Sequence, residues 1–264
     1  LLRQGNSYKN TVNWIKKIQK KIAKSKAYDY KMNALTTITQ FSLPYYKQIV
    51  DEFVGLGFDG IHLRPVTPFG LYNESERKRI WPSSSAFLEF YKKALKYIID
   101  LNLKGKNFYE RSAKIFLAKI LTEEDPNFLD TRSPCGAGIG QLAYNYNGDV
   151  YSCDEGRMLA VIGDETFKVG NVNRNSASEL ISNDTVKALC LASFLDNLPV
   201  CNDCVYKPYC GVCPVYNYLM EKNIFSRIPQ NEKCRIHQGI LDYIFIKLKE
   251  DKNKEVFLKW LKKA

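Results

Sequence analysis

The chain has 264 residues, of which 45% are apolar, so it can bury a sizeable core as one large domain or two small ones. No stretch reaches the roughly 18 uninterrupted apolar residues that a membrane-spanning helix needs. The start of the chain, LLRQGNSYKN, has neither the apolar segment nor the cleavage site of a signal peptide. We therefore expect a cytoplasmic globular protein with no membrane partner.

The net charge of +11, from 39 Lys and Arg against 28 Asp and Glu, would suit an acidic partner such as nucleic acid. The lysines gather in segments 14–26 and 247–264, where isoleucine, valine and leucine recur at roughly helical spacing. A solvated helix face explains this pattern better than a binding patch. Nucleic acid is therefore not the expected partner.

The first 120 residues alternate between helix and strand patterns. The predicted elements, in chain order, are a helix at 8–24, a strand at 30–39, a helix opened by Pro44, a strand at 56–66, a loop at 67–85, and helices at 86–102 and 108–121. Helices and strands that alternate with short connections indicate a parallel α/β sheet. Two confident strands are too few to close a barrel, so this α/β part is expected to be truncated on its N-terminal side.

All eight cysteines lie at or beyond position 135, which marks a change of character along the chain. We place a domain boundary near residue 125 and predict two domains, 1–124 and 125–264. In the second domain we expect a strand at 167–172, a capped helix at 176–190 and a long terminal helix from residue 234.

A β-hairpin is predicted at residues 142–150. Apolar and aromatic residues alternate there, and Asn147-Gly148 supplies the positive-φ pair of a tight turn. The hairpin would bring Cys135 and Cys153 towards the same end of a two-stranded ribbon.

The segment CNDCVYKPYCGVCP, residues 201–214, puts four cysteines into thirteen positions and follows the last with proline. In a reducing compartment, cysteines at this density favour metal binding or redox chemistry over disulfides. The first three are separated by two and five residues, which suits zinc or an iron–sulfur cluster. The short five-residue gap, the final Cys-Pro, the number of cysteines and the glycines beside them favour iron–sulfur, with zinc as the alternative.

The cysteine pattern resembles the SPASM domain, the C-terminal extension of radical S-adenosylmethionine (SAM) enzymes that modify peptides and proteins. The resemblance covers about residues 125–240 and rests on Cys135, Gly148, Cys153, Cys201, Cys204, Cys210, Cys213 and Cys234. One spacing departs from the usual pattern, since two residues rather than three precede Cys213. Within the family, NYNGDVYSCDEGRML and YKPYCGVCPVYNY look most like the maturases of His-Xaa-Ser peptide systems.

By this resemblance, two auxiliary [4Fe–4S] clusters are implied. An outer cluster would be held by Cys201, Cys204, Cys210 and Cys234, and an inner cluster by Cys135, Cys153 and Cys213. The family often has one further cysteine just upstream of the first, and this chain has none there. Either Cys190 is the fourth inner ligand or one iron keeps an open site. A buried helical thiol is an equal explanation of Cys190.

The resemblance also implies site residues outside the cysteine sets. Asp154 matches an aspartate that looks like the catalytic base of sulfatase-maturing relatives, although a solvated residue that caps a turn is the plainer reading. Asn33, Thr37 and Arg64 lie on the two predicted strands and would face a barrel interior, where relatives hold SAM. An arginine at a strand end pairs equally well with a surface carboxylate.

The implied fold is α/β: the C-terminal half of a partial (β/α)6 radical SAM barrel, followed by a small α+β SPASM domain. Radical SAM enzymes carry a CxxxCxxC loop after their first strand, and this chain has no cysteine before Cys135. We therefore expect an N-terminally incomplete enzyme that does not cleave SAM alone. Its full-length form would bind SAM and a third [4Fe–4S] cluster.

The implied partners are a peptide or small-protein substrate and an electron donor such as flavodoxin or ferredoxin. Two other functions stay open at the level of sequence. One is a stand-alone iron–sulfur electron-transfer module, and the other is a zinc-stabilised basic binding domain.

Overall fold

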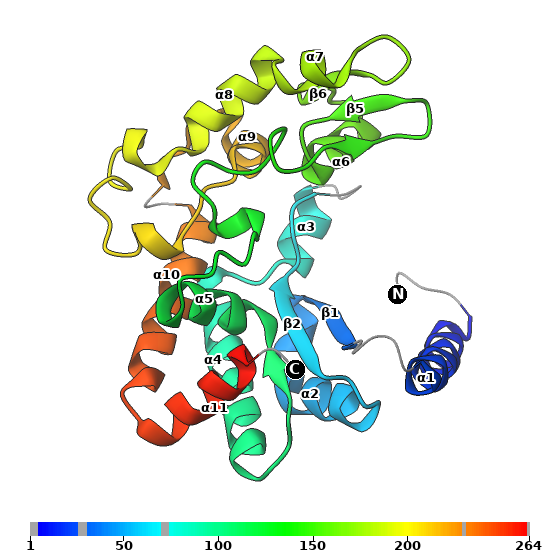
Figure 1. Ribbon diagram of the computed structural model, residues 1–264, viewed down its shortest axis with the longest axis vertical. Helices are drawn as coiled ribbons and strands as arrows, with labels where there is room; N and C mark the ends of the chain where they lie inside the picture. The colour runs from blue at the N-terminus through cyan, green and yellow to red at the C-terminus, as the bar shows by residue number, and fades with distance from the viewer. Residues whose placement is uncertain (1–4, 26–30, 70–73, 229–230, 263–264) are drawn as a thin grey trace.

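The computed structural model of the chain describes residues 5–25, 31–69, 74–228 and 231–262 (Figure 1). The elements of the first half are α1 (Ser7–Lys24), β1 (Asn33–Ile38), α2 (Tyr46–Gly55), β2 (Gly60–Pro65), α3 (Glu74–Ile80), α4 (Ser84–Leu103), β3 (Tyr109–Glu110) and α5 (Arg111–Leu121). Those of the second half are β4 (Ala143–Tyr144), β5 (Asp149–Tyr151), α6 (Asp154–Val161), β6 (Lys168–Asn171), α7 (Ala177–Ile181), α8 (Asp184–Ser193), α9 (Pro214–Glu221), α10 (Glu232–Leu248) and α11 (Asp251–Leu261).

The first sheet has the order β1-β2-β3, and both of its strand pairs are parallel, which confirms the predicted α/β pattern. Two details differ from prediction. The predicted helix at 108–121 starts as the short strand β3, whose two residues are too few to give a periodic signal. The predicted loop at 67–85 contains α3. Residue 30 of the predicted first strand and residues 70–73 of the loop lie outside the described residues.

The main core lies between this sheet and the helices α2, α4 and α5. Ala34 and Ile38 of β1 and Ile61 and Leu63 of β2 are buried against apolar side chains of these helices. Helix α4 supplies the largest share because its apolar residues recur three and four positions apart and form one wide stripe. Its start is fixed by Ser83, whose hydroxyl accepts a hydrogen bond from the backbone N–H of Ala86.

The last two helices return to this core. Apolar residues of α10 and α11, among them Leu241, Ile244 and Trp260, are buried with those of α4 and α5. At Gly239 of α10, an added Cβ would lie 2.5 Å from a methyl carbon of Leu88 on α4, so the two helices approach closely only because this residue is glycine. The C-terminal helices therefore share a core with the first half of the chain.

The second sheet is antiparallel with the order β4-β5-β6, and it lies at the opposite end of the long axis from α2 and α11 (Figure 1). The predicted hairpin is confirmed, but its turn differs. Gly148 has a φ of 84°, whereas Asn147 does not have a positive φ. The N–H of Gly148 donates to the carbonyl of Asn145, which makes a longer loop with one left-handed glycine.

The predicted helix at 176–190 is two helices, α7 and α8. The side chain of Asn183 accepts from the N–H of Thr185 and starts a new helix there. Ser176 and Glu179 form the capping box of α7, which agrees with the predicted cap.

Helix α1 stands apart from both sheets and has no buried residue (Figure 1). It is attached to α2 by the Tyr8 hydroxyl, which donates to Glu52, and by the Gln19 amide, which donates to the carbonyl of Leu56. Its lysines are exposed, as the sequence predicts for a solvated face. Across the described ranges, no helix is long and apolar enough to cross a membrane.

Glu110 is the buried polar anchor of the first core. Its carboxylate accepts hydrogen bonds from the backbone N–H of Leu63 at 3.1 Å, the N–H of Ala113 at 2.7 Å and the Tyr91 hydroxyl. We predict that Glu110→Ala lowers the free energy of unfolding by about 3 kcal/mol, because it leaves buried donors without an acceptor. Urea denaturation measures this change. Glu89→Ala, at an exposed pair with Lys93, is the control and should leave the midpoint unchanged. Equal effects of the two substitutions would contradict the role assigned to Glu110.

Candidate metal centre and adjoining cavity

Five cysteines line one cavity of about 60 Å³: Cys201, Cys204, Cys210 and Cys234, which are the predicted outer set, and Cys213. The first two follow α8, and consecutive turns bring them together, since the N–H of Cys204 donates to the carbonyl of Cys201. Cys234 is in the first turn of α10. Burial, and after it the charge of Cys234, raises the pKa of Cys201 to about 11 and that of Cys210 to about 12. The structure therefore brings the predicted outer set to one place.

A second set, Cys135, Cys153 and Cys213, is packed in one cluster of buried residues. Cys153 and Cys213 precede α6 and α9, and their sulfur atoms accept from the N–H groups of Gly156 and Tyr216, both at 3.4 Å. A helix N-terminus favours a thiolate over a thiol. Cys135 and Cys153 lie in this cluster together, and the N–H of Gly138 donates to the carbonyl of Ser152, which holds the segment after Cys135 against the residue before Cys153.

Burial acts against ionisation of these thiols. It raises the pKa of Cys135 and Cys153, and it raises that of Cys213 to about 12. A buried thiol with a raised pKa becomes a thiolate only when a metal takes the place of its proton. Thiolates in sets of three and four are the usual ligands of iron–sulfur clusters, so the donor sets fit that group.

An iron–sulfur cluster and a single zinc ion require different spacings of the sulfur atoms. Zinc requires each sulfur about 2.3 Å from the metal, whereas in a cluster each thiolate binds a different iron. In the part of the chain that the structure describes, no three His, Cys, Asp or Glu side chains are close enough to hold one metal ion. The outer thiols instead line a shared cavity of about 60 Å³.

Gly211 allows the cysteine-rich loop to approach the segment before Cys135. A Cβ at this position would lie 2.7 Å from the carbonyl oxygen of Arg132 and 2.9 Å from that of Asp130. The loop from Cys210 to Cys213 can therefore lie against this backbone only with glycine at position 211.

A larger cavity of about 110 Å³ adjoins the inner set. It lies at the carboxyl end of β2 and is lined by residues of α4, α5, α6, α9 and α10. Cys213 and Lys233 line this cavity and also the smaller one, so they stand between the two. Six aromatic side chains form much of the wall, and they are Phe69, Trp81, Phe87, Phe116, Phe128 and Tyr216.

An ion pair lies in this wall. The ammonium of Lys233 is 2.6 Å from a carboxylate oxygen of Asp130. Burial is the largest single influence and would raise the pKa of Asp130, but the charge and hydrogen bond of Lys233, together with the charges of His237 and Arg64, outweigh it and hold the pKa at about 2. The same pairing, with the nearby charge of Cys213, raises the pKa of Lys233 despite its burial. Both groups are therefore charged at neutral pH.

Both histidines of the chain line the larger cavity. Burial lowers the pKa of His62 to about 3 and that of His237 to about 4, so both rings are neutral at pH 7. Nδ1 of His237 is 3.5 Å from the sulfur of Cys210, which connects this cavity with the outer set. Sequence reasoning missed these residues, together with Asp130 and Lys233. The rarity of histidine was the one signal that could have found two of them.

The three residues predicted to face a barrel interior divide into two groups. Thr37 and Arg64 are partners in the β1–β2 register at the carboxyl end of the sheet, and Arg64 lines the larger cavity. Asn33 is paired with Gly60 at the other end, roughly 13 Å along the strand from Thr37. Its side-chain oxygen is buried without a hydrogen-bond partner in the described parts of the chain.

Asp154 and Cys190 lie apart from the thiol sets. The Asp154 carboxylate is 62% exposed and paired with Arg157 at 2.7 Å. Cys190 is on α8 and packs against the apolar cluster behind β5 and β6, which includes Val150 and Val186. Burial raises the pKa of its thiol.

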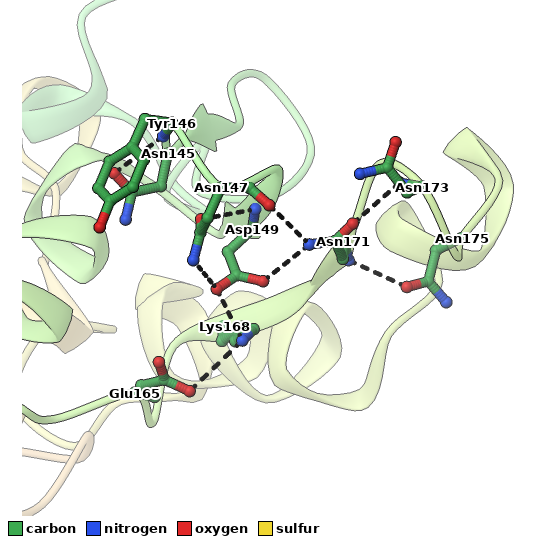
Figure 2. Close-up of polar contacts among 9 residues, drawn as sticks. All are labelled: Asn145, Tyr146, Asn147, Asp149, Glu165, Lys168, Asn171, Asn173 and Asn175. Carbon is green, nitrogen blue, oxygen red and sulfur yellow. Dashed lines mark hydrogen bonds and ion pairs between the residues drawn. The ribbon is translucent and has the colours of Figure 1, made fainter.

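A polar network fixes the hairpin that leads to Cys153 (Figure 2). The Asp149 carboxylate accepts from the side-chain amides of Asn147 at 2.8 Å and Asn171 at 3.0 Å, and it is 2.9 Å from the ammonium of Lys168. These bonds, that from Lys168 first, lower the pKa of Asp149 to about 2.

Comparison with known proteins gives a partial match to a family. Residues 135–205 match the SPASM family, described as an iron–sulfur cluster-binding domain. The match contains two members of the inner set and two of the outer set. No curated protein matches the chain.

Solved structures share the fold over most of the chain. Native anSMEcpe with bound AdoMet aligns with a TM-score of 0.67 at 18% identity, over 91% of this chain and 62% of the other. The complex of native anSMEcpe with AdoMet and the Kp18Cys peptide aligns with a TM-score of 0.67 at 18% identity, over 90% and 61%. The complex with AdoMet and the Cp18Cys peptide aligns with a TM-score of 0.67 at 16% identity, over 91% of this chain and 62% of the other. The chain therefore has the α/β fold of these proteins and spans about three fifths of their length.

The Asp149 network predicts a specific pH dependence. The pKa of Asp149 in the folded chain is about 2, below the value of about 3.9 that is usual for an aspartate in an unfolded chain. The stabilisation is therefore complete above the unfolded pKa and is lost as pH falls towards the folded pKa. Asp149→Asn should lower the urea midpoint at pH 7. The difference from the unchanged chain should shrink between pH 4 and pH 2. Because Asp130 titrates equally in both chains, a difference that is constant with pH would contradict this account.

Proposed function

We propose that this chain is the C-terminal part of a radical SAM enzyme that modifies a peptide, and that it binds two auxiliary [4Fe–4S] clusters. The observation that carries the proposal is the division of seven buried or half-buried cysteines into a set of four and a set of three. The match of residues 135–205 to an iron–sulfur domain supports it. Residues 1–124 would be the barrel part and residues 125–264 the cluster domain with its terminal helices.

Separate sets of cysteines would hold the two clusters. The outer group would be bound by Cys201, Cys204, Cys210 and Cys234 and the inner group by Cys135, Cys153 and Cys213. When bound, such clusters accept and pass single electrons. The protein contributes the helix N-termini that favour two inner thiolates, and a half-buried cation, Lys233, between the sets.

The larger cavity would receive a side chain of the peptide substrate. Its aromatic wall excludes water, and Arg64, Asp130 and Lys233 supply charged groups that fix orientation. The solved anSMEcpe complexes with AdoMet and peptides support this assignment by analogy of fold. The resemblance to His-Xaa-Ser maturases makes a small protein of that kind the proposed substrate, with flavodoxin or ferredoxin as electron donor.

The S-adenosylmethionine site would involve the carboxyl end of the first sheet. Thr37 and Arg64 are neighbours there. Asn33, at the other end of the strand, suits a role in the sheet itself. The proposed base, Asp154, would act only after leaving its ion pair with Arg157, because the carboxylate is held by that pair.

The cluster proposal predicts a definite iron content. After anaerobic reconstitution, the chain should bind about eight iron and eight sulfide per polypeptide and absorb near 400 nm. Cys210→Ser should remove about half of this iron, because it takes one ligand from the outer set. Cys190→Ser is the control and should retain it. One zinc per colourless chain, or equal losses in both variants, would contradict the proposal.

The chain by itself should not cleave SAM. No cysteine precedes Cys135, so the CxxxCxxC loop that binds SAM through a site-differentiated iron is not within these 264 residues. Incubation of the reconstituted chain with SAM and dithionite should release no 5′-deoxyadenosine above a protein-free control. Turnover by this chain would show that another cluster performs the cleavage.

A further inference from the structure

The inner set has three cysteines and leaves one iron of a four-iron cluster without a protein thiolate. Helix α8 shows why Cys190 is a poor candidate for that place. Leu189 and Ser193, four residues apart, face the inner set, and the Ser193 hydroxyl accepts from the N–H of Cys135 at 2.9 Å. Cys190 is on the adjacent face with Val186, also four residues apart, inside the apolar cluster of the second sheet.

Glu155, unlike Cys190, lies close to the inner set. It is in the first turn of α6, two residues after Cys153, and its side chain lines the larger cavity together with Cys213 and Lys233. Its neighbour Asp154 is turned to solvent and paired with Arg157.

The charge of Glu155 reaches all three inner thiols. After burial, it is the largest cause that raises the pKa of Cys153. It acts in the same direction on Cys135 and Cys213, where the charge of Asp130 acts more strongly, although that carboxylate is already held in its ion pair with Lys233. Glu155 also raises the pKa of Lys233, as a nearby negative charge does.

A carboxylate oxygen is a suitable ligand for iron, which accepts carboxylates in many non-haem sites. We propose that the Glu155 carboxylate binds the iron atom that Cys135, Cys153 and Cys213 leave open in the inner cluster. The inference rests on the proposed function, because it requires that an iron–sulfur cluster forms there. Since Glu155 lines the larger cavity, an iron atom bound to it would lie beside the proposed peptide site.

The test uses the full chain, reconstituted anaerobically, with cyanide as the probe of an open iron. Three variants accompany the unchanged chain: Glu155→Gln, Glu155→Cys and the neighbouring control Asp154→Asn. Electron paramagnetic resonance of the reduced protein is recorded before and after cyanide is added. The spectrum reports ligation of the cluster and does not depend on catalytic activity.

In Glu155→Gln, cyanide should shift the spectrum of one cluster at concentrations that leave the unchanged chain and Asp154→Asn as they were. Glu155→Cys should keep the full iron content, show a shifted spectrum without cyanide and resist cyanide, because a thiolate can replace the carboxylate at the same iron. This rescue separates ligation from a merely structural role.

The inference is overturned if the unchanged chain and Glu155→Gln respond to cyanide alike, or if Cys190→Ala gains the response and Glu155→Gln does not. A chain that binds no second cluster at all would refute the proposed function itself. A chain with two clusters whose spectra are unaffected by Glu155→Gln refutes only the assignment of this ligand.

Discussion

The packing of seven buried or half-buried thiols in two groups is the constraint on which the second half of this molecule depends. A buried thiol is a weak acid, and the raised pKa of Cys153 and Cys213 shows how strongly this environment resists a free thiolate. Metal binding removes the resistance, because the thiolate charge is then shared with the metal. The second sheet is small and its strands have two to four residues, so bound metal would add the stability that a small core lacks.

The ion pair between Asp130 and Lys233 joins this half to the first. Asp130 belongs to the segment after α5, and its carbonyl lies where a side chain at Gly211 would have to be. Lys233 precedes Cys234 on α10, a helix whose other face belongs to the main core. The ion pair therefore fixes the positions of the cysteine-rich loop and the C-terminal helix relative to each other, and with them the two cavities. Removal of one partner would leave a half-buried charge without its counter-ion, which is unfavourable.

Much of the local structure follows from the sequence alone. The periodicity of α4 and the alternation before Gly148 predict a helix and a hairpin because each is a local property of the chain. The break between α7 and α8 was missed, since Asn183 acts as a cap only in a particular backbone geometry. The return of α10 to α4 depends on a close approach at Gly239. The cavity with Asp130, His237 and Glu155 also joins residues far apart in sequence, and no local pattern reports it. The two cysteine sets came from the family resemblance, and the structure places the outer set around one cavity and the inner set in one apolar cluster.

An anaerobic crystal structure of the reconstituted chain, with anomalous diffraction recorded on both sides of the iron absorption edge, tests the central claim most directly. The account predicts two separate iron peaks, one among the sulfur atoms of Cys201, Cys204, Cys210 and Cys234 and one beside those of Cys135, Cys153 and Cys213. A single peak that appears only at the zinc edge, or iron located away from these sulfur atoms, would contradict it.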